Sequence, residues 1–156
     1  MGRPAYRQLQ RSHYKALHAV CDFVDKDIVV RYMERIVVRC EIIHSATYCR
    51  KLKRNSFTVQ TTAGMYFEIL TFLVANLHGQ EQCYAIGHYL TVVNYRLCSR
   101  AKPKLKFGHI IPVSRSRDVL AAVAAVDIKQ KCVFISLPYL PVDFVCIQVH
   151  SLERCT

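Results

Sequence analysis

The stretch Met65-Tyr-Phe-Glu-Ile-Leu-Thr-Phe-Leu-Val-Ala-Asn-Leu77 is the chain's best run of apolar residues, and the fold prediction depends on it. A helix that is apolar on nearly every side is usually buried in a core. Thr61 or Thr62 could cap such a helix at its start, and Gly79 could end it. We therefore expect a buried central helix over residues 65–77. A buried pair of strands is the alternative, because periodicity alone does not separate the two for short apolar runs.

Upstream of this run, the pattern predicts one long helix and two strand regions. Apolar and aromatic side chains recur at helical spacing between Pro4 and Val24, and Pro4 suits a first-turn position. Residues 36–42 alternate in the manner of a half-buried strand, whereas residues 28–35 fit either a strand or a helix. Residues 57–60 form a short strand candidate.

Downstream of the run, residues 84–98 are ambiguous, with a strand favoured from His88 onward. Residues 107–113 are expected to be extended. Ser114 or Ser116 could cap a helix over residues 118–126. Residues 131–137 and 142–149 are predicted strands of a hairpin, joined by Pro138-Tyr-Leu-Pro141. The element order predicts an α+β fold, with a mainly antiparallel sheet, an N-terminal amphipathic helix laid across it and the buried central helix.

Composition fits one compact basic domain over residues 1–156. Of these residues 52% are apolar, which is enough for a core and argues against disorder. Several of the 8 cysteines, such as Cys132 and Cys146, stand within apolar runs, where a free thiol behaves as a small hydrophobe. The polar N-terminus contains no apolar signal core, and no apolar run is long enough to span a membrane. We therefore expect reduced thiols in an intracellular protein of the cytoplasm or nucleus, neither secreted nor membrane-spanning.

Positive charge gathers in three regions of the sequence. There are 22 Lys and Arg against 11 Asp and Glu, a formal net charge of +11. Such an excess describes partners and solubility rather than fold. A solvated surface is the plain explanation, but clustering in three places favours a binding role. The predicted anion-binding residues are Arg3, Arg7, Arg11, Lys15, Arg50, Lys51, Lys53, Arg54, Arg96, Arg100, Lys102, Lys104, Lys106, Arg115 and Arg117.

These clusters predict a non-enzymatic protein that contacts nucleic acid through phosphates, with RNA favoured over DNA. Phosphate contacts carry little sequence information, so we expect weak sequence preference and a steep salt dependence. Tyr6, Tyr14, Tyr48, Tyr95 and Phe107 stand beside cations and could stack on bases of a single strand. Burial in the core is their ordinary alternative.

Other chemistry is poorly supported by the sequence. Cys40, His44 and Cys49 have a spacing that invites a zinc hypothesis, but a fourth ligand would have to come from a distant residue such as Cys21. Core cysteines are the favoured interpretation. No catalytic signature or Gly-rich phosphate loop is present. We expect no catalytic residues, no metal, no cofactor and no small-molecule substrate; an enzyme that uses Cys and His is the second alternative.

The segments Asn55-Ser-Phe-Thr-Val and Met65-Tyr-Phe-Glu-Ile-Leu-Thr-Phe-Leu resemble rhabdovirus matrix proteins in their predicted strand-then-helix order. In size, basicity and Cys and Tyr content, the chain is also similar in style to small viral accessory, matrix or capsid proteins. The resemblance transfers no residue roles. It implies the first alternative function, a structural assembly protein that self-associates and binds an anionic membrane or a nucleoprotein.

Overall fold

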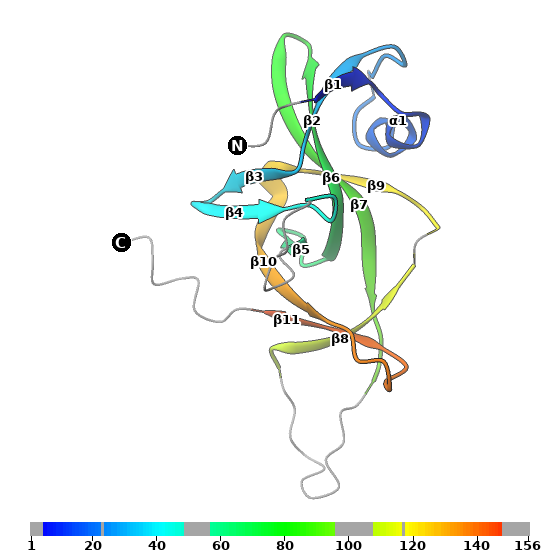
Figure 1. Cartoon of the computed structure of the whole chain (residues 1–156), viewed down its shortest axis with the longest axis vertical. Coiled ribbons are helices and arrows are strands. Elements are labelled where there is room, and N and C mark those ends of the chain that lie inside the picture. The colour runs from blue at the N-terminus through cyan, green and yellow to red at the C-terminus, as the bar shows by residue number, and fades with distance from the viewer. Residues whose placement is uncertain (1–4, 23, 49–56, 96–107, 117, 148–156) are drawn as a thin grey trace, which may run out of the picture.

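The computed structural model describes residues 5–22, 24–48, 57–95, 108–116 and 118–147, and it consists mainly of antiparallel strands (Figure 1). Strands hold 57% of these residues and helical segments 9%, so the α+β prediction is wrong and the fold is β-rich. The elements, in chain order, are β1 (Ala5–Gln8), α1 (Arg11–His18), β2 (Val29–Met33), β3 (Arg35–Val38), β4 (Glu41–His44), β5 (Thr58–Thr61), β6 (Tyr66–Leu77), β7 (Gln80–Val92), β8 (Ile110–Arg115), β9 (Ala121–Ala124), the short 3-10 helix η1 (Ala125–Asp127), β10 (Ile128–Ile135) and β11 (Asp143–Ile147).

The expected central helix is wrong, because residues 66–77 form the long strand β6. This strand pairs with β7 along its whole length, and His78 and Gly79 join the two with φ values of 53° and 79°. Two positive φ angles suit a tight hairpin whose twist matches that of its strands. Gly79 therefore marks a hairpin turn and not a helix end. Both faces of β6 are buried, with Tyr66 and Phe67 in different core clusters, so the strand lacks the usual alternation.

Six strands close into a ring. Hydrogen-bonded pairs follow the order β6, β5, β10, β11, β8 and β7, and the β6–β7 pairing completes the circuit. All six pairings are antiparallel. We call this arrangement the closed sheet. One core cluster joins its strands and consists of Tyr66, Leu90, Val113, Cys132, Phe134 and Val145.

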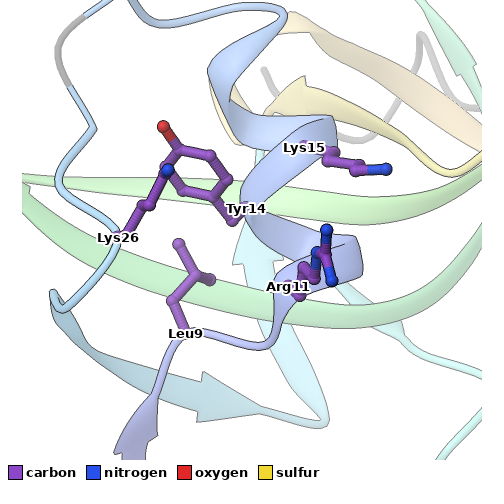
Figure 2. A pocket seen from close by; sticks show the side chains of 5 residues that line it. All are labelled: Leu9, Arg11, Tyr14, Lys15 and Lys26. Atoms are coloured by element: carbon purple, nitrogen blue, oxygen red, sulfur yellow. The ribbon is translucent and has the colours of Figure 1, made fainter.

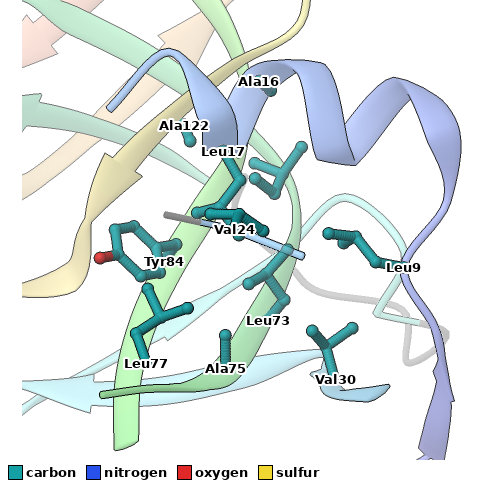
Figure 3. Close-up of a cluster of buried hydrophobic side chains, with 11 residues drawn as sticks. Leu9, Ala16, Leu17, Val24, Val30, Leu73, Ala75, Leu77, Tyr84 and Ala122 are labelled. Atoms are coloured by element: carbon teal, nitrogen blue, oxygen red, sulfur yellow. The ribbon is translucent and has the colours of Figure 1, made fainter. Parts of the chain in front are cut away.

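The β6–β7 hairpin continues beyond the closed sheet and carries β2 and β1 on one side and β9 on the other. Helix α1 covers this extension (Figure 1). The predicted helix over residues 4–24 is therefore too long, because residues 5–8 pair with β2 instead. Figure 3 shows the core beneath α1, which consists of Leu9, Ala16, Leu17, Val24, Val30, Leu73, Ala75, Leu77, Tyr84, Ile86 and Ala122.

The strand prediction for residues 36–42 is confirmed in type but not in number. A turn at Arg39 and Cys40, with φ values of 48° and 63°, divides the run into β3 and β4. Ile36 and Ile43 pair across the hairpin and are buried against the large sheet. Residues 29–33, left open between strand and helix, form β2.

In the C-terminal third, the helix expected over residues 118–126 is wrong. Residues Ala121–Ala124 form β9, which pairs with β7, so sheet pairing overrides the helix propensity of these alanines, and Ala125 begins η1. The Ser116 hydroxyl donates to the Asp118 carboxylate at 3.2 Å and caps no helix. The other strand predictions are confirmed: β5, β8 and the β10–β11 hairpin lie where expected, and β7 covers the strand favoured from His88.

The strand-then-helix order behind the resemblance to matrix proteins is also corrected, since both segments are strands. No helix formed by the described residues is both long enough and apolar enough to cross a membrane.

Candidate anion-binding site

A hollow of about 420 Å³ lies beside α1, and three cations border it. We call it the α1 hollow; its lining residues are Leu9, Arg11, Tyr14, Lys15 and Lys26. Figure 2 shows Arg11 and Lys15 on successive turns of α1, with Lys26 next to the Tyr14 ring. Arg11, Tyr14 and Lys15 come from the helix, and Lys26 comes from the loop that precedes β2. The hollow therefore joins charges from two separate parts of the chain.

Packing holds α1 in the position that this site needs. The helix has no side-chain N-cap and no acid in its first turn, and Arg11 stands there against the helix dipole. Ala16 and Leu17 are buried under the helix, in the core shared with β7 and β9. Arg11 and Lys15 are exposed and four residues apart, which places them on a common face. The buried pair thus fixes the helix, and the cations remain open to solvent.

Tyr14 gives the α1 hollow an aromatic surface. Its ring is half-buried and packs against the core beneath the helix. The Lys26 ammonium lies 6.0 Å from the ring centroid, and the His18 ring centroid lies 5.5 Å away. This cation–π contact places a positive charge beside a fixed aromatic ring. Such a combination can bind a phosphate and the base attached to it.

The cations of the hollow are not neutralised by contact ion pairs with other described residues. The ion pairs formed among the described residues are Arg31–Glu81, Arg115–Glu68 and Arg115–Asp143, and none of them includes a cation of the α1 hollow. Asp25 and Asp27 flank Lys26 in sequence, but the Asp25 carboxylate accepts the Asp27 backbone N–H at 3.2 Å and so stabilises the turn. Both acids are exposed, where water and salt screen them.

The structure places four of the predicted anion-binding residues. Arg11 and Lys15 border the α1 hollow. Arg7 is exposed on β1 and does not line it. Arg115 lies at the closed sheet, where its guanidinium pairs with Glu68 at 3.2 Å and Asp143 at 3.8 Å. Outside the described residues lie Arg3, Arg50, Lys51, Lys53, Arg54, Arg96, Arg100, Lys102, Lys104, Lys106 and Arg117.

Lys26 is the lining cation that sequence reasoning missed. It stands between two aspartates, so the sequence around it has no excess of positive charge. Only the fold brings it to Tyr14, twelve residues earlier in the chain.

The structure places some of the cysteines and histidines considered for zinc binding or catalysis. Within the described ranges, no group of three or more His, Cys, Asp or Glu side chains could hold a metal ion. Cys40 lies in the β3–β4 turn and His44 is the last residue of β4, while Cys49 lies outside the described residues. Burial raises the pKa of Cys83 to about 11 and that of Cys132 to about 12. Thiols with raised pKa values are poor nucleophiles at neutral pH.

Comparisons with protein-family models, with curated proteins and with solved structures found no match to this chain.

Proposed function

We propose that the protein binds single-stranded nucleic acid, RNA in preference to DNA, without catalysis and with little sequence specificity. The observation that carries the proposal is the α1 hollow, where Arg11, Lys15 and Lys26 gather around the Tyr14 ring. The net charge of +11 supports it, because a polyanion is attracted to the whole molecule before it reaches the site.

The chemistry of the hollow explains why a single strand suits it. Guanidinium and ammonium groups bind phosphate oxygens, and they do so without regard to the base sequence. A tyrosine ring can stack on an unpaired base of any kind, whereas bases in a duplex are already stacked on one another. Three cations beside one ring therefore fit a flexible strand that presents phosphates and an exposed base together.

The test is the binding of a short oligouridylate across a series of salt concentrations. For a single strand, each phosphate contact contributes a slope of about −0.7 to log K against log salt. Lys26→Gln should weaken binding and make the slope shallower by about 0.7. If the affinity of the wild type did not change with salt concentration, the proposed phosphate contacts would be contradicted.

Arg31→Gln is the matched control, because it also lowers the net charge by one. Arg31 already pairs with Glu81 at 3.3 Å and does not line the hollow. Its replacement should leave the salt slope close to that of the wild type. Equal effects of Lys26→Gln and Arg31→Gln would mean that total charge, and not the hollow, controls binding. Flotation with anionic vesicles, in competition with the oligouridylate, separates this function from assembly on a membrane.

A further inference from the structure

A second group of positive and aromatic side chains lies on the β3–β4 hairpin. Arg35 and His44 are direct partners across this hairpin, so their side chains share one face. The His44 ring centroid lies 4.4 Å from that of Tyr48, and the Arg35 guanidinium carbon lies 6.0 Å from the Tyr48 centroid. The three side chains thus lie together at the base of the hairpin.

Strand β10 adds a lysine to this face. The tip of the hairpin is tied to β10 by Arg39, whose Nη1 donates to the carbonyl oxygen of Lys129 at 3.5 Å. Lys131 follows two residues later, close enough for its charge to act on the His44 imidazole. The hairpin and β10 lie close together in Figure 1, although more than 80 residues separate them in sequence.

The electrostatics at His44 show that this face is positive. Burial, and then the charges of Lys131 and Arg35, lower the pKa of His44. The nearest acids along the hairpin are Glu34, which is exposed, and Glu41, which alternation places on the opposite face from His44. No ion pair between described residues involves Arg35, Arg39 or either lysine of β10.

We infer that this face is a second phosphate-binding site, the hairpin cluster, which binds the backbone of the same nucleic acid strand. Its members are Arg35, Arg39, His44, Tyr48 and Lys131. The inference rests on the proposed function, since its ligand is the single strand that the α1 hollow takes. Cations from the hairpin and β10 lie there beside an aromatic ring, which is the same chemistry as in the α1 hollow. The bound strand then spans two separate patches of the surface.

His44 provides a local reporter of occupancy. A phosphate bound beside Arg35 and Lys131 favours the imidazolium form, so it should raise the pKa of His44 by about one pH unit. The measurement is an NMR titration of the His44 ring with and without saturating oligouridylate. His88 on β7 is the internal control. Its Nδ1 lies 3.1 Å from the Val119 carbonyl oxygen, and its NMR signals should not respond to the ligand.

Variants test the same site by affinity. Arg35→Gln and Lys131→Gln should each make the salt slope shallower by about 0.7, and Arg31→Gln should not. If oligouridylate binds with a slope that depends on the α1 hollow but leaves the His44 titration unchanged, the hairpin cluster is overturned and the proposed function stands. If the oligouridylate does not bind at all, both are overturned. The His44 measurement uses the wild-type chain, so it does not depend on the folding of a variant.

Discussion

A polar contact between His13 on α1 and Tyr32 on β2 adds to the packing between these two elements. The His13 Nδ1 lies 3.0 Å from the Tyr32 hydroxyl, and the ring centroids are 5.6 Å apart. Burial lowers the pKa of His13 and raises the pKa of Tyr32. Both groups are therefore held in their neutral forms, and an added proton on His13 would disturb this contact between α1 and β2.

Because of the lowered pKa of His13, we expect the protein to lose stability as the pH falls below neutral. The folded-state pKa of His13 lies below the unfolded value of 6.5, so the unfolded chain binds more protons as the pH falls. The free energy of unfolding should decrease from about pH 7.5 down to the lowered pKa, and His44 contributes in the same direction. Urea denaturation across this range measures the slope.

His13→Gln removes the titrating group while keeping a polar side chain beside Tyr32. The variant should show a shallower dependence of stability on pH than the wild type, whatever its overall stability. Identical slopes in the two proteins would show that His13 does not contribute.

At the scale of elements, β6 shows what limited the prediction from sequence. Its residues were recognised as buried, but a strand covered on both faces has the same even apolarity as a buried helix. The segment that forms β9 was likewise predicted as a helix, because its even run of alanines and valine shows no strand alternation. Strands with β-branched residues and one open face, such as β3, were predicted correctly because their alternation survives.

The candidate site was predictable to the same partial extent. Arg11 and Lys15 were identified because their four-residue spacing falls within the true helix. Arg7 shares that spacing but lies on β1, so the helical pattern extended one turn too far. Lys26 and the hairpin cluster depend on contacts between distant segments, which no local pattern encodes.

Gly87 allows the close approach of β6 and β7. A side chain built at this position would overlap the backbone oxygen of Glu68. The register of the two strands shifts between Ile69 and Thr71, directly beside the pairing of Ile69 with Gly87. Such a bulge bends a strand, and here it stands where β6 leaves the closed sheet for the extension under α1.

Replacing this glycine should therefore disrupt the central hairpin. Gly87→Ala is expected to cost about 3 kcal/mol of stability, because backbone and not a flexible side chain must move. Chemical denaturation measures the loss. Gly108→Ala is the matched control, since a side chain at Gly108 meets no atom within 4 Å and should be close to neutral. A mild effect at Gly87 would mean that the two strands separate easily at the bulge.

At the scale of the whole molecule, four strands of the closed sheet are joined by one charged group. Arg115 on β8 contacts the carboxylates of Glu68 on β6 and Asp143 on β11. Its guanidinium carbon lies 4.1 Å from the Phe134 ring centroid on β10. The Glu68 side chain is only 8% exposed, so its charge is compensated by this arginine and not by water. Arg115, which the sequence predicts as an anion-binding residue, thus links four strands.

Removing the Arg115 guanidinium should destabilise the fold, because the buried Glu68 carboxylate would lose its ion-pair partner. Arg115→Met is expected to lose about 3 kcal/mol, because Glu68 would then be a buried carboxylate without its pair. The double variant with Glu68→Gln should lose less than the sum of the two single changes, which urea denaturation can show. Additive losses would mean that the two side chains act independently.

The closed sheet also sets the order in which the chain can fold as it is made. β5 needs β10 as a neighbour, and their paired residues Gln60 and Gln130 are 70 positions apart. At a synthesis rate of about 5–20 residues per second, β5 emerges about 4–14 seconds before its partner. During that interval the β6–β7 hairpin can form behind it while one edge of β5 stays unpaired. The nascent chain therefore presents an open strand edge to the cell, which is the period when chaperones or premature association would act on it.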